Sequence, residues 1–220
     1  MIIARNVYFS YTNTKPFTLS GIGLHIDRGE YVSVVGDNGS GKTTLMRLVL
    51  KLLKPTSGSI ETAAERIGYV PQRSDYNNHD FPLTVGEMLK SYSKIVGANH
   101  KNSVPEVLER CGLVGLEKAL TGELSGGESQ KARIARALIG SPELLIFDEP
   151  STGIDLASGD AIYALLRSLN RENGITVVTV EHNLKAAMEN STHIYHLAGG
   201  NGHICTPRQY ANEFLGAGDV

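Results

Sequence analysis

The stretch that decides the expected fold is Gly36-Asp37-Asn38-Gly39-Ser40-Gly41-Lys42-Thr43-Thr44. Its glycines, lysine and hydroxyl residue fit Gly-x-x-x-x-Gly-Lys-[Ser/Thr], the spacing of a phosphate-binding loop. The β-branched run 31–35 before it favours a buried strand, and the run 45–53 after it, without Gly or Pro, favours a helix. A glycine-rich turn between the two points backbone N–H groups at an anion, beside the positive end of the helix. The sequence therefore predicts an α/β fold with a site for nucleotide phosphates.

Composition excludes several classes of protein. The 220 residues are 41% hydrophobic and 20% charged, which is ordinary for a soluble globular protein. The formal net charge of -2 argues against generic nucleic-acid binding. No run of 18 apolar residues is present and no signal peptide precedes the first strand, so we expect no membrane-spanning helix and a cytoplasmic location. Cys111 and Cys205 lie far apart, and no disulfide is expected.

The N-terminal part of the chain predicts antiparallel strands. Residues 2–35 alternate apolar and polar positions and lead into the strand at 31–35. Tyr11 ends the apolar run 7–11 just before a polar loop. An aromatic ring there can stack on a purine or pack on the core, and the spacing alone favours the core.

The middle of the chain predicts a helical insert. Residues 66–71 read as a second buried strand, which is followed by Gln72 and by the polar linker 73–80. Residues 81–122 read as mostly helical, with a capping box at Thr84 and Glu87. Helices inserted between a nucleotide core and later strands indicate a second lobe that can move about its linkers.

A further helix begins near Ser125. Ser125 and Glu128 have the spacing of a capping box, and the helix runs to Leu138. A plain cap does not require the adjacent Gly126 and Gly127, which suggest that an anion or another chain's backbone approaches closely. From the residues alone, a plain capped helix and a contact site both stay open.

Two strand ends carry further polar side chains. The apolar run 143–147 ends at Asp148 and Glu149, beyond the carboxyl end of a strand, where ligands bind in open α/β sheets. Because adjacent residues on a strand point to opposite sides, we expect one carboxylate to hold Mg²⁺ and the other to face a water; a solvated acidic loop is the alternative. Residues 175–180 likewise deliver Glu181 and His182, a histidine that can reach the same site or be structural.

The C-terminal part contains His193, His196, His203 and Cys205, which are residue types that bind metal ions, but their spacing disfavours a metal site. Residues 193–197 and 203–205 read as two strands of a hairpin. On a strand, His193 and His196 lie on opposite faces and cannot both ligate one ion.

In this order, the motifs resemble those of the ATP-binding subunit of an ABC transporter, over residues 2 to about 215. The segment 124–128, Leu-Ser-Gly-Gly-Glu, matches the ABC signature. The resemblance identifies Gln72 as the Q-loop glutamine, residues 151–155 as the D-loop and His182 as the switch histidine. It implies a P-loop NTPase core, with a mixed sheet and N-terminal antiparallel strands, and an inserted helical lobe. A single domain 1–220 would then have its core lobe at 1–72 and 141–220 and its helical lobe at about 73–140.

The resemblance also implies cofactors and roles. Two ATP molecules, with Mg²⁺, lie in the interface of a head-to-tail homodimer, so Ser125 and Gly127 reach the γ-phosphate of the other subunit's site. Glu149 polarises the attacking water and His182 holds water and phosphate in place, while Tyr11 stacks on adenine. The implied ATP-binding residues are Tyr11, Gly36, Asn38, Gly39, Ser40, Gly41, Lys42, Thr43, Thr44, Gln72, Ser125, Gly126, Gly127 and Asp155. The implied catalytic residues are Glu149, His182 and Lys42, and the implied Mg²⁺ residues are Thr43, Gln72 and Asp148.

A finer resemblance concerns the transported substrate. Residues 69–73, 80–85 and 202–207 are similar to those of ATPases of zinc and manganese importers. This implies a subunit at the cytoplasmic face of the membrane, docked through residues near 73–85 on a transmembrane permease and served indirectly by an extracytoplasmic binding protein. The alternatives are the ATPase of an iron-siderophore or amino-acid importer, or a soluble ABC ATPase outside transport. Two departures from the family are Glu181, where Ser or Thr is common, and Leu156, where Pro is common.

Overall fold

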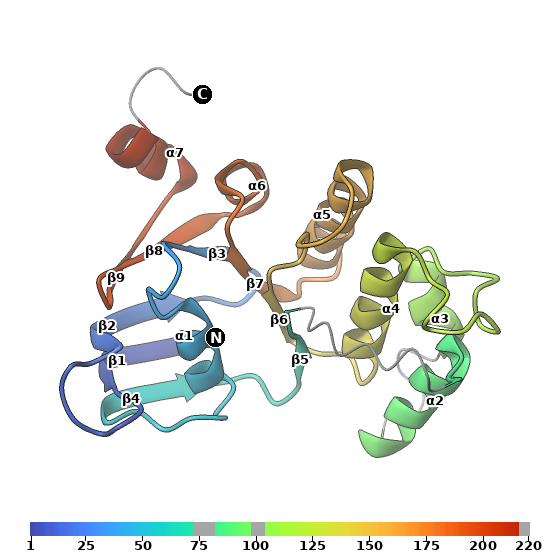
Figure 1. Ribbon diagram of the computed structural model, residues 1–220, viewed down its shortest axis with the longest axis horizontal. Coiled ribbons are helices and arrows are strands. Elements are labelled where there is room, and N and C mark those ends of the chain that lie inside the picture. Colours follow the sequence, from blue (N-terminus) through green and yellow to red (C-terminus); the bar gives the residue numbers. More distant parts are fainter. Residues whose placement is uncertain (73–81, 98–103, 216–220) are drawn as a thin grey trace.

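A six-stranded sheet forms the centre of the molecule, in the order β5-β6-β7-β3-β8-β9 (Figure 1). The computed structural model describes residues 1–72, 82–97 and 104–215. The sheet strands are β3 (Tyr31–Val35), β5 (Ile67–Val70), β6 (Leu144–Asp148), β7 (Thr176–Glu181), β8 (His193–Ala198) and β9 (Asn201–Cys205). All neighbours pair in parallel except β8 and β9. Every residue of β3, β6 and β7 is buried, as the apolar runs predict for parallel strands covered on both faces.

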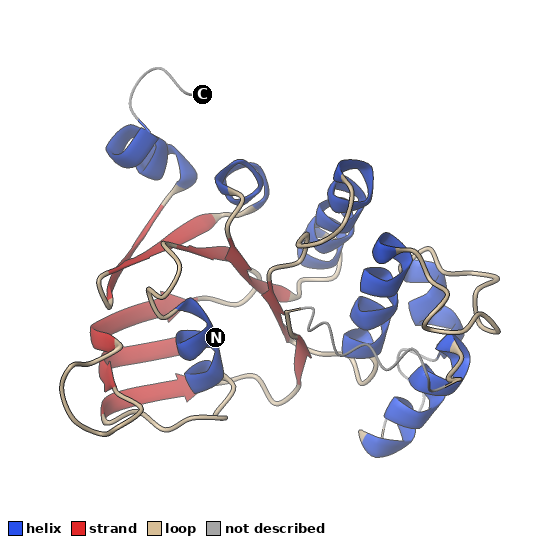
Figure 2. Cartoon of the chain, in the orientation of Figure 1, coloured by secondary structure: helices blue, strands red, loops and turns tan. Residues whose placement is uncertain are grey.

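A smaller antiparallel sheet lies beside the first, in the order β2-β1-β4 (Figure 2). Its strands are β1 (Ile2–Phe9), β2 (Leu19–Ile26) and β4 (Ser57–Thr62). Helix α1 (Lys42–Val49) packs between this sheet and the central one, because its buried face shares one hydrophobic cluster with both. The antiparallel strands predicted before residue 31 are thus confirmed, while α1 ends earlier than the apolar run 45–53 indicates.

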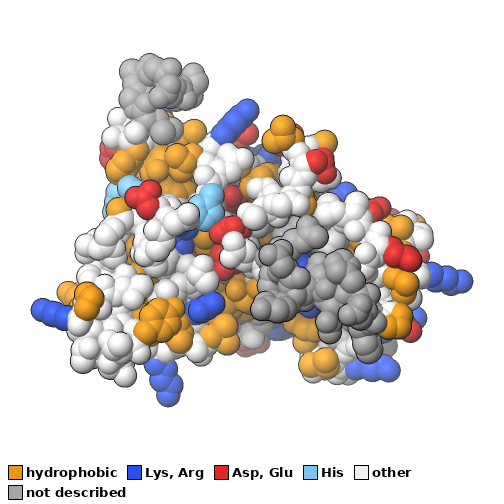
Figure 3. Space-filling model, viewed as in Figure 1, with side chains coloured by type: hydrophobic (Ala, Val, Ile, Leu, Met, Phe, Trp, Pro, Cys, Tyr) orange, Lys and Arg blue, Asp and Glu red, His pale blue; other side chains and the backbone are white. Residues whose placement is uncertain are grey.

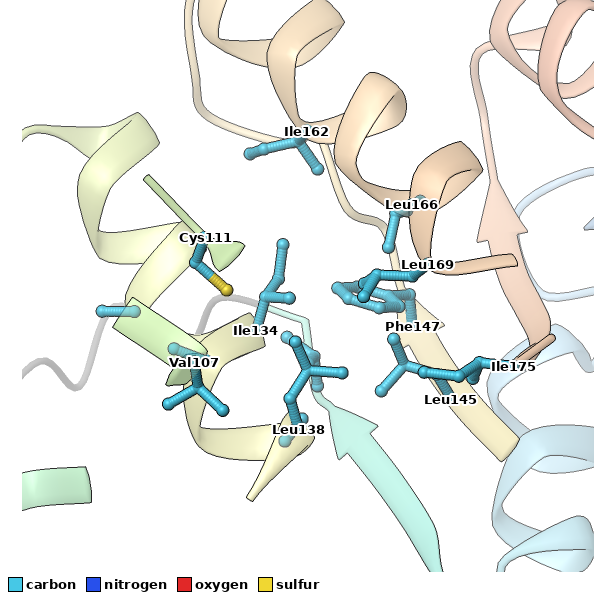
Figure 4. Close-up of a cluster of buried hydrophobic side chains, with 14 of the residues drawn as sticks. Val107, Cys111, Ile134, Leu138, Leu145, Phe147, Ile162, Leu166, Leu169 and Ile175 are labelled. Carbon is cyan, nitrogen blue, oxygen red and sulfur yellow. The ribbon is translucent and has the colours of Figure 1, made fainter. Parts of the chain in front are cut away.

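Three helices lie on the far side of the central sheet from α1 (Figure 1). They are α2 (Val85–Ile95), α3 (Val104–Arg110) and α4 (Gly126–Leu138). Their apolar faces form one cluster with β6, β7 and α5 (Leu156–Arg171), as Figure 4 shows around Ile134 and Phe147. The helical insert therefore shares its core with the sheet that carries the predicted site.

The expectation that 81–122 is mostly helical is wrong for its second part. After α3 the chain forms turns up to α4, and Gly112 and Gly115 have φ values of 64° and 87° there. Such left-handed backbone stops a helix, and glycine adopts it without the steric cost that other residues meet.

The C-terminal part completes the covering of the sheet. The elements are α6 (Leu184–Asn190), α7 (Pro207–Tyr210) and a π-helical turn (Ala211–Leu215). Helices α6 and α7 bury a small cluster with Val35 and Ile194. The predicted hairpin of β8 and β9 is confirmed. Among the described helices, none combines the length and the apolar content that crossing a bilayer requires.

Candidate functional site

Four neighbouring strands end at the same edge of the central sheet, and each delivers a predicted site residue. In sheet order, β5 leads to Gln72, β6 to Asp148 and Glu149, β7 to His182, and β3 to the loop at residues 36–41. Because parallel strands share one carboxyl edge, segments far apart in the sequence meet there. The topology thus brings together every predicted site residue that follows these strands.

The loop after β3 has the shape that phosphate binding requires. Gly36 has φ of 150°, and a Cβ there would lie 2.0 Å from the carbonyl oxygen of Leu197, so only glycine fits. Lys42 Nζ donates to the carbonyl oxygens of Gly36 (2.7 Å) and Asp37 (2.9 Å) and therefore points into the loop. Burial lowers the pKa of Lys42, against the opposing effect of Glu149, Asp37 and Asp148. The loop is a cradle of N–H groups with one ammonium at its centre.

The rest of the loop leaves polar atoms turned inward. Ser40 is buried, and among the described residues its Oγ has no hydrogen-bond partner. Asn38 lines a cavity of about 300 Å³ that continues toward Glu181 and His182. Unpaired buried polar atoms are costly in a folded chain, so their presence beside the loop fits a polar ligand.

Asp148 has the environment of a cation ligand. It is 3% exposed, and within the described part of the chain its Oδ1 has no hydrogen-bond partner. Burial, and then the neighbouring Glu149, raises its pKa, while a hydrogen bond from Thr43 and the charges of Arg47 and Lys42 oppose the rise. A buried carboxylate oxygen next to a threonine hydroxyl is a donor set that suits Mg²⁺. The residues present therefore fit this ion.

Glu149 is held by three side chains. Its Oε2 accepts from Gln72 Nε2 (2.7 Å) and Thr152 Oγ1 (2.9 Å). Its Oε1 lies 2.9 Å from His182 Nε2. The Glu149 side chain is 13% exposed and the His182 side chain 42%, so the pair lies at the surface end of the site. Gln72, which we expected near Mg²⁺, contacts Glu149 in this conformation.

The argument that Asp148 and Glu149 diverge because they alternate along a strand is wrong. Strand β6 ends at Asp148, and Glu149 has φ of 57°, in the left-handed region. The chain turns there, and the Glu149 N–H donates to the carbonyl oxygen of Val180. The turn, rather than strand alternation, sets the direction of the Glu149 side chain.

Tyr11 lies over the start of α1 and not in the core. Its hydroxyl lies 3.1 Å from Thr44 Oγ1, its ring meets the edge of Phe9, and 60% of its surface is exposed. The spacing alone favoured a core position, which is wrong because the chain leaves the sheet after Phe9. An exposed ring beside the phosphate loop is available for stacking.

The start of α4 is a complete capping box. Ser125 Oγ donates to Glu128 Oε2 (2.7 Å) and accepts from the Glu128 N–H. A Cβ at Gly127 would lie 2.6 Å from Ser158 Oγ, so a neighbour in the same chain already explains this glycine. Asp155 caps α5 by accepting from the Ser158 N–H (3.0 Å). Figure 1 shows α4, which Ser125 caps, well separated from α1, which follows the phosphate loop.

The remaining expectations concern a permease partner, nucleic acid, a metal site and a disulfide. Most of the expected permease-docking stretch, 73–81 of 73–85, lies outside the described residues. Over the described part of the face in Figure 3, basic side chains are scattered among acidic ones and form no continuous patch. Within the described ranges no group of three or more His, Cys, Asp and Glu can hold a metal ion, and Cys111 and Cys205 are free thiols.

Sequence reasoning missed Thr152 as a partner of Glu149, and it missed the contact of Glu181 with Tyr163. The first follows from the tight turn after Glu149. The second joins α5 to β7, and no local pattern reports such a pairing.

Comparison with known proteins identifies the family. A family model described as ABC transporter matches residues 19–152. The chain is 52% identical over 214 residues to a "Probable metal transport system ATP-binding protein" of Treponema pallidum (strain Nichols), covering 97% of this chain and 90% of that protein. It is 37% identical over 216 residues to the "Zinc import ATP-binding protein ZnuC" of Ruegeria sp. (strain TM1040), covering 96% and 83%.

A solved structure with the same fold is the dimeric, post-hydrolysis ATP-binding cassette MJ0796 bound to ADP and Pi. Its TM-score is 0.76 at 26% identity, and the match covers 94% of this chain and 99% of that one. The expected mixed α/β cassette fold and the resemblance drawn from the motifs are both confirmed. The chain therefore belongs to the ABC transporter family, in which it is an ATP-binding, ATP-hydrolysing subunit.

Proposed function

We propose that this chain is the ATPase subunit of an importer of divalent metal ions, zinc or manganese. The observation that carries the ATPase part is the position of Glu149, between Gln72, Thr152 and His182 at the sheet edge that holds the phosphate loop. The assignment of metal ions as the substrate is supported by two relatives, one named as a metal transport ATP-binding protein and the other as a zinc import ATP-binding protein.

ATP would be held at residues 36–44. The loop N–H groups and Lys42 bind its phosphates, and Tyr11 stacks on its adenine. Thr43, Asp148 and Gln72 would hold Mg²⁺, which neutralises phosphate charge when bound. Gln72 would have to leave Glu149 to do so. That exchange would remove one of the two hydrogen bonds to Glu149 Oε2 and leave the one from Thr152.

Hydrolysis needs a group that orients and deprotonates the attacking water. Glu149 has a carboxylate at the surface end of the site, and His182 Nε2 lies 2.9 Å from it. We assign Glu149 as the general base and His182 as the group that holds the water and the γ-phosphate in place.

A second copy of the chain would complete each site. Ser125, Gly126 and Gly127 start α4 away from the chain's own loop, and the relative MJ0796 forms a dimer in its post-hydrolysis state. We propose a head-to-tail homodimer that closes on ATP and opens after hydrolysis, at the cytoplasmic face of the membrane. Its partners are a permease that docks near residues 73–85 and, through it, an extracytoplasmic binding protein.

The ATPase part is tested with the purified chain and Mg²⁺-ATP. Glu149→Gln should bind ATP but release phosphate at least about 100-fold more slowly, as for the loss of a general base. The same change should shift the protein to a dimer in ATP, measured by size-exclusion chromatography with light scattering. Glu65→Gln removes an exposed carboxylate and is the control, since its side chain is 85% exposed. Near-normal turnover of Glu149→Gln would refute its role.

The substrate is tested by uptake. Cells that lack this gene should lose uptake of ⁶⁵Zn or ⁵⁴Mn, and the wild-type chain should restore it while Glu149→Gln should not. Intact metal uptake with lost uptake of an iron-siderophore or an amino acid would overturn the metal assignment in favour of another importer. Intact uptake of all three classes would point to an ABC ATPase outside transport.

A further inference from the structure

Glu181 is a buried carboxyl group that the mechanism above does not use. It is the last residue of β7 and 2% exposed, and it pairs in register with Val35, directly before the phosphate loop. Its side chain lines the cavity shared with Asn38 and His182. Among the described residues, Glu181 Oε1 has no hydrogen-bond partner. A costly buried acid next to the switch histidine calls for a physical reason.

A chain of hydrogen bonds leads from this carboxyl group to the turn after β6. Tyr163 on α5 donates from its hydroxyl to Glu181 Oε2 (3.0 Å). The Ser151 hydroxyl lies 2.9 Å from the same oxygen of Tyr163. Since the single hydroxyl proton of Tyr163 is used on Glu181, Ser151 is the donor of the second bond. Tyr163 and Glu181 are 5% and 2% exposed, so their hydrogen bond is shielded from water, while Ser151 is partly exposed.

The same two segments are joined a second time, nearer the surface. The turn after β6 carries Glu149 and Ser151, and the end of β7 carries Glu181 and His182. Glu149 meets His182 at 2.9 Å in the open part of the site. Tyr163 makes the corresponding connection in the interior. When the outer contact is exchanged for substrate, the inner side-chain connection remains, together with the backbone hydrogen bond from the Glu149 N–H to the carbonyl oxygen of Val180.

We propose that Glu181 is a positioning residue, which through Tyr163 and Ser151 fixes the strand end carrying His182 relative to the turn carrying Glu149. The inference rests on the proposed roles of Glu149 and His182 in hydrolysis. It gives a reason for a buried carboxyl group at this position, because the Glu181 side chain accepts a hydrogen bond from the hydroxyl of Tyr163.

The charge of Glu181 is part of this arrangement. Burial raises the pKa of Glu181 to about 8, hydrogen bonds from Tyr163 and Thr179 oppose the rise, and Glu149 adds to it. The titratable groups that act on it are Tyr163 from α5, Tyr31 from β3 and Glu149 after β6. The cavity that it lines also contains Asp37, His182, His196 and Tyr210. The group is therefore mostly neutral at pH 7, and it becomes a second negative charge beside Glu149 as the pH rises through about 8.

The first test compares two buried tyrosines. Tyr163→Phe removes the hydroxyl of the chain and keeps the ring. Tyr195→Phe is the matched control, because Tyr195 is fully buried and donates to the carbonyl oxygen of Gly23 (3.1 Å), away from the site. Both variants should lose similar thermal stability. Tyr163→Phe should lower kcat about fivefold with an unchanged KM for ATP, while Tyr195→Phe should leave both constants unchanged.

The second test uses the charge and does not depend on Tyr163→Phe folding. Glu181→Gln keeps an oxygen for Tyr163 to bond and stays neutral at every pH, so its kcat at pH 7 should match that of wild type. Between pH 7 and 9, the kcat of wild type divided by the kcat of Glu181→Gln should fall about fivefold. The reason is that ionised Glu181 places a second negative charge beside Glu149, which repels its carboxylate. Glu181→Ala should lose kcat at pH 7, and Glu181→Gln is its conservative rescue.

Each outcome decides the proposal. It is overturned if Tyr163→Phe and Tyr195→Phe have the same kcat, or if the wild-type and Glu181→Gln pH profiles superimpose. Failure of the proposed function is a different result: wild type without turnover, or Glu149→Gln with normal turnover. Wild-type hydrolysis that needs Glu149 but ignores Tyr163 removes only the positioning role.

Discussion

The helix starts at α1 and α4 are both predicted to meet phosphate, yet they are built in opposite ways. Helix α1 starts at Gly41, in the left-handed region with φ of 103° and without a side-chain cap or an acidic residue in its first turn. Helix α4 starts at Ser125 with both halves of a capping box in place. An uncapped start leaves N–H groups for a ligand, whereas a capped start is stable alone. The difference teaches that the start of α1 leaves N–H groups available to a ligand, while the start of α4 is already capped within the single chain.

The largest expected effect is the loss of ATP binding at the start of α1. Lys42→Ala removes the ammonium that points into the loop, together with its two bonds to backbone carbonyls. Because a charge-assisted contact to phosphate is lost, the Kd for ATP should rise about 100-fold, measured by calorimetry with Mg²⁺-ATP. The exposed Lys185, which pairs with Glu189, provides the control Lys185→Ala, and this variant should bind ATP normally. Unchanged ATP affinity in Lys42→Ala would contradict the placement of Lys42.

A smaller effect separates the two jobs assigned to Ser125. Thr84 starts α2 with the same capping box, so Thr84→Ala and Ser125→Ala remove equivalent caps. Each should cost about 1 kcal/mol of stability, seen as a similar fall in Tm. Only Ser125→Ala should also lower ATP turnover, by about 10-fold or more, because the partner's phosphate loses a donor.

The result is informative in either direction. Equal ATP turnover of Thr84→Ala and Ser125→Ala would mean that Ser125 acts as a helix cap alone. The prediction that the start of α4 meets phosphate would then be wrong. Mixing Lys42→Ala with Ser125→Ala chains adds a stricter control. A head-to-tail dimer of one chain of each kind keeps one complete site, so the mixture should regain part of the activity that both variants lack.

The smallest expected effect is on stability in acid. The pKa of Glu128 is lowered chiefly by its bond with the Ser125 side chain, and that of Glu87 chiefly by the Thr84 backbone N–H. A lowered carboxyl pKa contributes stability that is complete above about pH 4.5 and is lost as the pH falls through the folded value. Glu128→Gln and Glu87→Gln should therefore lose less Tm than wild type between about pH 5 and pH 3.

This acid effect should be the same at both helices. A much larger effect at Glu128 than at Glu87 would mean that the start of α4 does more for the isolated fold than a cap does. No corresponding carboxylate exists in the first turn of α1, so its start should show no such pH dependence.

Local patterns predicted much of the fold because the signals lie close together in the chain. Strand, turn and helix around Gly36 follow from residue types within a few positions of one another, and so do the caps at Thr84 and Ser125. The order of strands across the sheet is not local. This order was not predicted from the sequence, although it brings the ends of β5 and β6 together, so that Gln72 meets Glu149.

The errors have a common cause in backbone geometry. Strand alternation failed at Glu149 because β6 ends at Asp148 and the backbone of Glu149 is already in the left-handed region. The spacing of Tyr11 continues that of β1 and by itself favoured a core position, although the strand ends at Phe9. The pairing of Glu181 with Tyr163 joins two elements whose contact depends on how α5 packs, which no periodicity encodes.

The left-handed backbone of Glu149 carries a consequence for engineering. A residue with a side chain at φ of 57° bears about 1 kcal/mol of strain that glycine would not. At position 149, the backbone conformation favours glycine, whereas the proposed chemistry requires a carboxylate. A screen for thermostable variants would tend to select glycine there and discard the carboxylate, so such a screen has to hold this residue fixed.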